Sequence, residues 1–380
     1  MRPAPHRQGP HGDPGPRAIL QVGLAQAALG FAVAGIGGCL LLLARDLDVE
    51  FAALAWIAST FGVGLLVVGA TFRVLLRRGP QPLLRAAALT AAIGAVLLAV
   101  APTVVLAAAG GLLLGLGNAA LALLTPTLLR GPDAGRLLAR ATGVSCVTGI
   151  LAPPALAAVD AVGGAGRLGI ALVAVPLLAL AATAGGARTT PDDAAPPTDR
   201  SGPVGHVARR WAAVVLAVAV EFCFVVWGVV RLRDTGLSTA TATAVSTVFV
   251  AGMAVGRIGA ARLADRRAAV PCAAVLVVAA TLLVTVTADP LVTAVGLGVA
   301  GLAVALLYPA TLSGLLAAAS PDRGAALGAL ASGTAILLAP SGLGLLADVL
   351  DLRVALPVAV LPLAVALAVA DLRPAPRTRP

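Results

Sequence analysis

Residues 231–266 read RLRDTGLSTATATAVSTVFVAGMAVGRIGAARLADR, and residues 43–78, LARDLDVEFAALAWIASTFGVGLLVVGATFRVLLRR, lie on them without a gap. Matches between alanines or leucines are expected by chance in so apolar a chain, but a repeated Arg-Asp pair is not. The positions that coincide are Arg45/Arg233, Asp46/Asp234, Phe61/Phe249, Gly64/Gly252, Leu75/Leu263 and Arg78/Arg266. A second match sets residues 114–126 on residues 297–309, aligning Gly115 with Gly298 and Pro126 with Pro309. These repeats predict a chain built from two related halves.

The composition of the chain indicates a membrane protein. Hydrophobic residues make up 59% of its 380 residues and charged residues only 12%, whereas about a quarter of the residues in a soluble domain are charged. The net charge of +10 does not indicate nucleic-acid binding, because the arginines occupy short gaps between apolar runs and few aromatic residues accompany them. The cysteines lack the spacing of metal ligands or disulfides, and we expect buried hydrophobic roles for all four, Cys39, Cys146, Cys223 and Cys272.

Runs of about 20 apolar residues, the length that crosses a bilayer, predict an all-α integral membrane protein with twelve transmembrane helices. The corners at Ala101-Pro102 and Asp289-Pro290 are short, which leaves a count of eleven open. The predicted spans are 18–44, 51–72, 83–101, 103–129, 137–159, 167–187, 211–231, 239–260, 268–288, 290–317, 325–346 and 354–371.

The polar segments predict how these spans are grouped. A proline-rich linker, residues 188–210, separates a six-helix half at 18–187 from a second half at 211–371, and polar tails occupy residues 1–17 and 372–380. Placing both termini in the cytoplasm puts 22 of the 27 arginines on the cytoplasmic side, as expected for short loops. We therefore predict a multi-pass protein of the cytoplasmic membrane with both termini, the linker and the loop ARLADRR, residues 261–267, inside.

These features resemble the major facilitator superfamily of transporters. The loop ARLADRRA, residues 261–268, keeps Leu263, Asp265 and Arg266 of the family's loop signature, and RVLLRRG, residues 73–79, is a more divergent copy. GLLLGLGNAA in the fourth span resembles a family motif, with Gly111 where an arginine is usual. The stretch GNAALALLTPTLLRGPDAG also resembles, weakly, the cyanate and nitroimidazole branch.

The resemblance implies two pseudo-symmetric six-helix bundles and a secondary transporter that works by alternating access. It further implies a cytoplasmic gating loop, to which we assign Asp265, Arg266, Arg262, Arg77 and Arg78. The acidic member of this latch occurs in the second half alone, since Arg77 stands where the second half has Asp265. A loop that only sets the topology, with a solvated Asp265, is the alternative.

Glu221 is the main candidate for function, because it lies near the middle of the seventh span, WAAVVLAVAVEFCFVVW. An ionised group at that depth costs about 2.5–3.5 kcal/mol on insertion scales, so a glutamate there suits proton loading and release. A hydrogen-bonded structural glutamate is the alternative. Lesser candidates for contact with substrate or proton are Asn118, Tyr308, Trp227 and Gln26.

The charge of the predicted cavity favours a neutral, cationic or lipophilic solute. Arg257, near the inner end of the eighth span, is the one residue that would admit an anion if it turned inward. The charges at the outer loop edges, Asp160, Arg167, Arg45 and Arg233, are expected to be solvated.

We therefore expect a secondary active transporter of a small organic solute, proton-coupled, with efflux slightly favoured. An uptake permease for a small anion of the cyanate type is one alternative, and a non-transporting sensor or scaffold with the same fold is another. An enzyme is not expected, because no carboxylate pair lies within a span and the absence of lysine excludes a phosphate-binding P-loop. No cofactor, metal or nucleic acid is expected, and the partners are the solute, a proton and the bilayer, with the protein a monomer.

Overall fold

A computed structural model describes residues 15–129, 133–185, 203–263 and 269–372, and this part of the chain is almost entirely helical. Twelve helical segments are long and apolar enough to cross a membrane, which confirms the predicted fold class and count. The first half contains α1 Pro16–Asp46, α2 Ala52–Leu76, α3 Pro80–Val100, α4 Val104–Leu128, α5 Ala134–Ala161, the 3-10 helix η1 Gly166–Val173 and α6 Ala174–Thr183. The second half contains α7 Val204–Arg233, α8 Thr239–Val245, α9 Thr247–Leu263, α10 Ala269–Val286, α11 Pro290–Ala318, α12 Pro321–Ala347 and α13 Leu352–Leu372.

Both short corners separate two helices, so the alternative count of eleven is wrong. Thr103 caps α4 by accepting a hydrogen bond from the backbone N–H of Leu106 at 3.3 Å. The Asp289 carboxylate caps α11 by accepting from the N–H groups of Leu291 and Val292 at 2.8 and 2.9 Å. Side-chain oxygens at these positions satisfy the unpaired donors of a new helix, which is why each corner starts one.

Two spans differ from the continuous α-helices expected. The sixth begins as the 3-10 helix η1, and the eighth is divided into α8 and α9 at Ser246. Hydroxyl groups around that break bond to the backbone: Thr243 donates to the Thr239 carbonyl at 2.8 Å and Ser246 to the Thr243 carbonyl at 2.7 Å. Such bonds compete with the regular helix pattern and bend helices.

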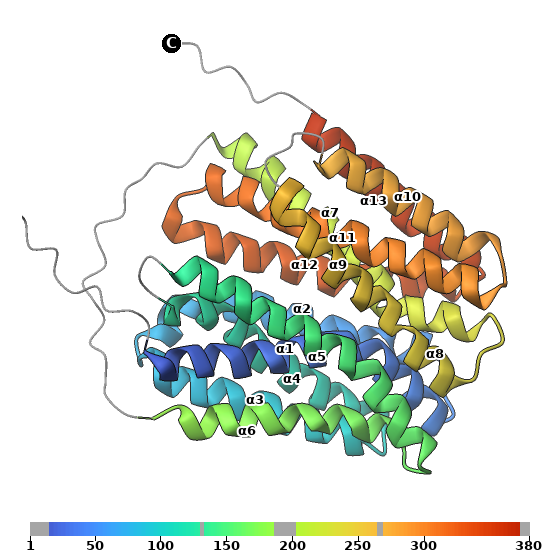
Figure 1. Cartoon of the computed structure of the whole chain (residues 1–380), viewed down its shortest axis with the longest axis horizontal. Helices are drawn as coiled ribbons and strands as arrows, with labels where there is room; N and C mark the ends of the chain where they lie inside the picture. Colours follow the sequence, from blue (N-terminus) through green and yellow to red (C-terminus); the bar gives the residue numbers. More distant parts are fainter. Residues whose placement is uncertain (1–14, 130–132, 186–202, 264–268, 373–380) are drawn as a thin grey trace, which may run out of the picture.

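The two halves lie side by side, the first half below the second in Figure 1. Three sets of helices join them: α2 packs along α12, α1 packs against α7, and α5 packs against α8 and α9. The Ser59 and Ser341 hydroxyls, from α2 and α12, lie 2.7 Å apart in hydrogen-bond contact. Since α2 and α8/α9 are repeats of each other, as are α5 and α12, the interface has the pseudo-two-fold symmetry of the sequence.

Glycines that align in the sequence repeat lie at equivalent helix contacts in the two halves. A Cβ atom built on Gly64 would lie 2.6 Å from the Gly115 carbonyl carbon, and one on Gly252 would lie 3.0 Å from the Gly298 carbonyl carbon. Gly64 and Gly252 coincide in the sequence repeat, and so do Gly115 and Gly298. The α2/α4 and α9/α11 crossings are therefore the same close, glycine-dependent contact made twice.

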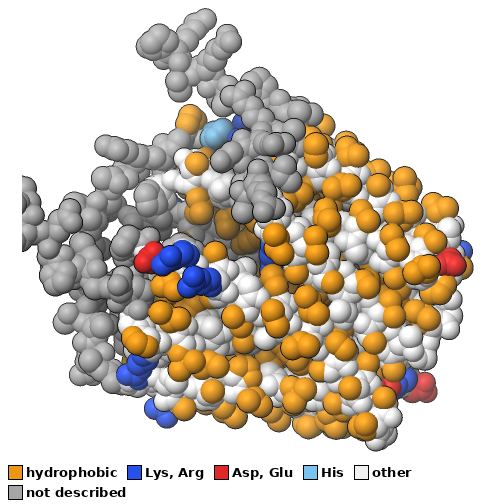
Figure 2. All heavy atoms as spheres, in the orientation of Figure 1, with side chains coloured by type: hydrophobic (Ala, Val, Ile, Leu, Met, Phe, Trp, Pro, Cys, Tyr) orange, Lys and Arg blue, Asp and Glu red, His pale blue; other side chains and the backbone are white. Residues whose placement is uncertain are grey.

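The outer surface agrees with a bilayer environment. Figure 2 shows a broad band of hydrophobic side chains, with charged side chains gathered toward the two ends of the molecule. Large hydrophobic residues are exposed along this surface, including Val105 and Leu345 at 80% and 72%. A contiguous apolar surface of this extent is typical of a protein solvated by lipid.

Candidate functional site

A central cavity of about 160 Å³ lies between the two halves and is the candidate site. Helices α1 and α5 of the first half and α7, α9 and α11 of the second supply its wall, together with Ser246 at the α8–α9 break. Most of the lining is apolar or small, and its aromatic members are Phe224 and Phe249, whose rings stack with centroids 6.3 Å apart. A cavity with a mostly apolar wall and a few polar groups is the usual form of a small-molecule site.

Glu221 lies in the wall of this cavity. It stands on α7, the long helix that packs against α1, α11, α12 and α13, and it is half-buried. Among the described residues, no side chain forms an ion pair with its carboxylate. The structure thus places the strongest candidate from the sequence inside the molecule and facing the cavity.

Arg257 turns inward and lines the same cavity. Its Nη1 donates a hydrogen bond to the Cys146 sulfur of α5 at 3.1 Å, so the contact joins the second half to the first. The guanidinium lies close enough to Glu221 to act on it electrostatically, although no ion pair forms between them. Cys146, expected to be merely a buried hydrophobic side chain, is half-exposed and lines the cavity.

Tyr308 lies close to these charges without lining the cavity. Its hydroxyl, on α11, lies close enough to Glu221 and Arg257 to interact with them electrostatically, and it lies beside Ser332 of α12. Glu221, Arg257 and Tyr308 are far apart in the sequence, and the packing of α7, α9 and α11 brings them together.

Asn118 does not lie on the cavity. It is buried within the first half at 2% exposure, and neither atom of its amide has a hydrogen-bond partner among the described residues. Gly111, two turns earlier in α4, lies where an arginine does not fit: a Cβ at this position would lie 2.7 Å from the Ile57 side chain and 3.1 Å from the Thr60 hydroxyl. Close packing of α4 on α2 occupies the space that the longer side chain would need.

Trp227 lies toward the carboxyl end of α7, in the wall of a second, open cavity of about 640 Å³. Its indole N–H donates to the Pro340 carbonyl at 3.1 Å, and its ring meets Phe51 edge-on with centroids 5.1 Å apart. Because Phe51 belongs to the first half, this aromatic contact connects the two halves. Gln26 is half-buried on α1 and is absent from both cavity walls.

The predicted gating loop lies largely outside the described residues. Asp265 and Arg266 are not described, and for Arg262 the structure describes only the α9 backbone. Arg77 and Arg78 are exposed in the turn between α2 and α3.

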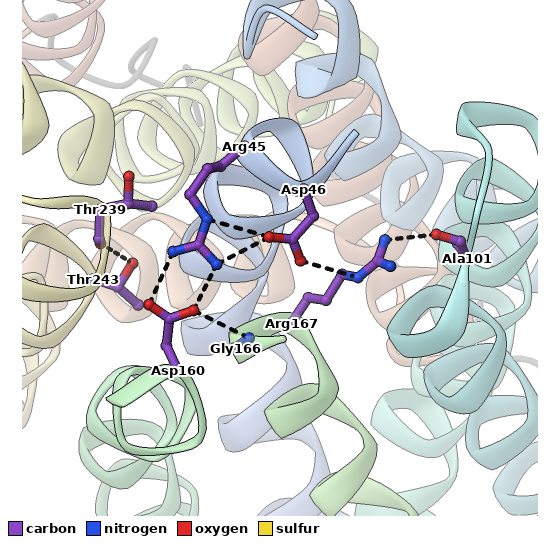
Figure 3. A network of polar contacts seen from close by, with 8 residues as sticks. All are labelled: Arg45, Asp46, Ala101, Asp160, Gly166, Arg167, Thr239 and Thr243. Atoms are coloured by element: carbon purple, nitrogen blue, oxygen red, sulfur yellow. Dashed lines mark hydrogen bonds and ion pairs between the residues drawn. The ribbon is translucent and has the colours of Figure 1, made fainter. Parts of the chain in front are cut away.

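Arg45, Asp160 and Arg167 form a network of ion pairs, whereas the sequence suggested solvated charges. Arg45 of α1 makes two bonds to the Asp160 carboxylate of α5, at 2.9 and 2.6 Å, and also binds Asp46 at 2.9 Å (Figure 3). Arg167 of η1 forms an ion pair with Asp46 at 3.2 Å and donates to the Ala101 carbonyl at 2.6 Å. Sequence reasoning missed this network because the partners are more than 50 residues apart; the repeated Arg-Asp pair was its only signal. Arg233 follows the expectation more closely, since it contacts only its neighbour Asp234, at 3.0 Å.

In the other half an arginine from a different helix, Arg231 of α7, makes a similar contact. Arg231 is fully buried and donates a hydrogen bond to the Thr287 carbonyl at the end of α10, just as Arg167 binds the Ala101 carbonyl at the end of α3. In each half an arginine thus binds a carbonyl at the end of the third span, where the helix dipole favours a cation.

No protein-family model matches the sequence, and a search of curated proteins finds no match. Among solved structures, a D-xylose–proton symporter gives a TM-score of 0.75 at 15% identity over 94% of this chain and 96% of that one. The peptide transporter POT in complex with sulfate gives 0.72 at 13% identity over 96% and 94%. The nucleoside transporter NupG gives 0.69 at 13% identity over 93% and 96%. The fold is shared with solved membrane transporters.

This shared fold agrees with the resemblance to the major facilitator superfamily, while the resemblance to its cyanate and nitroimidazole branch finds no support among these structures. At such low identity the likeness shows the fold, and function must be argued from the cavity. Among the described residues, no group of three or more His, Cys, Asp or Glu side chains could hold a metal ion.

Proposed function

We propose that the protein is a secondary active transporter, which moves a small organic solute across the cytoplasmic membrane by alternating access. The observation that carries the proposal is the position of the central cavity between two pseudo-symmetric halves, with both halves in its wall. Rocking one half on the other opens such a cavity to each side of the membrane in turn. The repeated glycine crossings keep each half rigid enough to move as a unit.

The proposal assigns proton coupling to Glu221. A carboxylate inside a membrane protein needs either a proton or a counter-charge, because the ionised form alone is poorly solvated there. Its place in the cavity wall gives the carboxyl access to whichever side the cavity faces, and Arg257 supplies a counter-charge nearby. Glu221 can therefore exchange a proton with one side and then with the other.

The remaining candidates keep narrower roles in this proposal. The arginine-rich side stays cytoplasmic, with both termini and the gating loop of Asp265, Arg266 and Arg262 on it and Arg77 and Arg78 opposite in the first half. Trp227 acts at the outer closure through Phe51, and Tyr308 shapes the field around Glu221. Asn118 and Gln26 have no role in solute binding.

Alternating access can be tested without knowing the solute. We would keep Cys146 as the reactive cysteine by the substitution Cys272→Ser, since Cys39 and Cys223 are buried. The purified chain, in liposomes of known orientation, would be treated with a membrane-impermeant maleimide from either side. Cys146 should be labelled from both sides, each at a measurable rate. A further variant with Cys146→Ser should remain unlabelled.

Labelling of Cys146 from one side alone would overturn the proposal. That result would favour the sensor or scaffold, because a cavity that never changes sides cannot carry a solute. Loss of double-sided labelling on cross-linking α2 to α12 between Ser59→Cys and Ser341→Cys would show that motion of the halves is the cause.

A further inference from the structure

Arg257 carries a permanent charge into a cavity that has little to balance it. A guanidinium does not lose its proton in proteins, and the Cys146 sulfur that accepts its hydrogen bond at 3.1 Å is a weak acceptor. No described carboxylate forms an ion pair with it. Among the described residues, the one acidic side chain in the cavity wall is Glu221, on which Arg257 acts from beyond contact distance.

Few charged or titratable side chains lie around Glu221, and each comes from a helix packed near it. Arg257 comes from α9, Tyr308 from α11 and Cys146 from α5. The part of α1 in the wall, Leu29 to Ala34, is apolar, and α8 carries no charged residue. The described charges of α12 and α13, Arg323 and Arg353, stand at the starts of their helices.

We infer that the solute is a small organic monoanion with an apolar body, and that its anionic group binds Arg257 while Glu221 holds a proton. This inference rests on the proposed transport function and names its substrate class. A carboxylate or similar group can make paired hydrogen bonds to a guanidinium. The apolar body would lie against Phe224, Phe249, Met253 and Leu297, which line the same cavity.

The charge of the cavity in each state explains why proton and anion travel together. The empty cavity is neutral when Glu221 is ionised opposite Arg257, and the loaded cavity is neutral when protonated Glu221 accompanies an anion on Arg257. The other two combinations leave one unbalanced charge in a medium of low dielectric constant, which is costly to bury. The two neutral forms are therefore the ones that change sides, and the movement is symport of one proton with one anion.

An anionic solute carried with a proton favours uptake, in place of the efflux expected from the sequence. The expectation of a neutral or cationic solute assumed an arginine-free cavity, whereas Arg257 lines it. A cation would require ionised Glu221 and would add to the charge of Arg257. Symport with protons drives uptake wherever the proton gradient points inward.

The test uses four probes that share one branched carbon skeleton: 3-methylbutanoate, 3-methylbutanamide, 3-methylbutylamine and the zwitterion valine. Binding to the purified full chain would be measured by thermal shift and calorimetry between about pH 5 and pH 8, with acetate and phenylacetate to vary body size. The anions should bind, more tightly as pH falls, with affinity changing up to about tenfold per pH unit because one proton binds with each anion.

Three variants locate the effect. Glu221→Gln, which imitates the protonated carboxyl, should bind the anion with an affinity that no longer depends on pH. Arg257→Gln should lose at least about tenfold in anion affinity, since it removes a charged hydrogen-bond donor. Arg323→Gln removes an exposed arginine outside the cavity and should bind as the unaltered protein does.

Preferential binding of the amine, the amide or valine would overturn the inference, and so would the absence of binding by all three anions. Anion affinity that rises with pH in the unaltered protein would overturn it too, a result that needs no variant to fold. If Cys146 is labelled from both sides while any of these results is obtained, the substrate class is wrong and the transporter proposal stands. Labelling from one side alone would remove the transporter proposal instead.

Discussion

The substitution Gly64→Ala tests whether the duplicated halves depend on close helix contact. The added Cβ would lie 2.6 Å from both the carbonyl carbon and the oxygen of Gly115, and 2.8 Å from the Leu116 nitrogen. Normal contact between such atoms is about 3.5–4.0 Å, so α2 and α4 would have to separate by roughly 1 Å. Both contact partners are backbone atoms, which cannot rotate away.

Overpacking of this kind costs about 1–3 kcal/mol, and the intrinsic preference of a helix for alanine over glycine returns about 0.5–1 kcal/mol. We therefore expect Gly64→Ala to lower the free energy of unfolding by about 1–2 kcal/mol. The matched control is Gly23→Ala in α1, where a Cβ would meet no atom within 4 Å; it should be neutral or stabilising. Gly252→Ala, in the repeated position, should behave as Gly64→Ala does.

The assay is thermal or denaturant unfolding of the full chain in one detergent, with the four proteins measured side by side. A Gly64→Ala protein as stable as Gly23→Ala would refute the reasoning. Destabilisation by Gly64→Ala with a neutral Gly252→Ala would show that the crossing is needed in one half only, and that the repeat in sequence is not a repeat in packing.

Two further substitutions probe a half-buried carboxylate and a buried amide. Asp160→Asn should lower stability by about 1 kcal/mol, because it weakens a charged double hydrogen bond to a partly exposed Arg45; Asp133→Asn, in the exposed pair with Arg136, is the control and should change nothing measurable. Asn118→Leu, which keeps the branched shape but removes an unpartnered buried amide, should raise the unfolding temperature and leave anion binding unchanged. A melting point below that of the unaltered protein, or weakened anion binding, would contradict the assignment of Asn118 to packing.

Much of the fold is predictable from the sequence because the bilayer imposes simple rules. Spans need about 20 apolar residues, so twelve of them can be counted, and the cap residues Thr103 and Asp289 mark the two shortest corners. The aligned glycines predict the repeated helix crossings. The break between α8 and α9 is harder to foresee, because it depends on which hydroxyl groups bond to the backbone.

The candidate site is less predictable because it depends on the direction of side chains. Glu221 is identifiable from its depth in a span alone. Arg257 lies toward the carboxyl end of α9, where the rotation of the helix determines whether the side chain meets solvent or the cavity, and the packing of α9 on α11 and α5 fixes that rotation. Cys146 carries no sequence signal, since its significance comes from Arg257, 111 residues away.

Proton uptake on anion binding tests the coupling of Glu221 and Arg257 most directly. Calorimetry of 3-methylbutanoate binding at about pH 8, repeated in buffers with different heats of ionisation, gives the number of protons bound with each anion. We predict about one proton for the unaltered protein and none for Glu221→Gln, with the anion still bound. Equal proton uptake by the two proteins, or none by the unaltered one at any pH where Glu221 is ionised, would contradict the coupling.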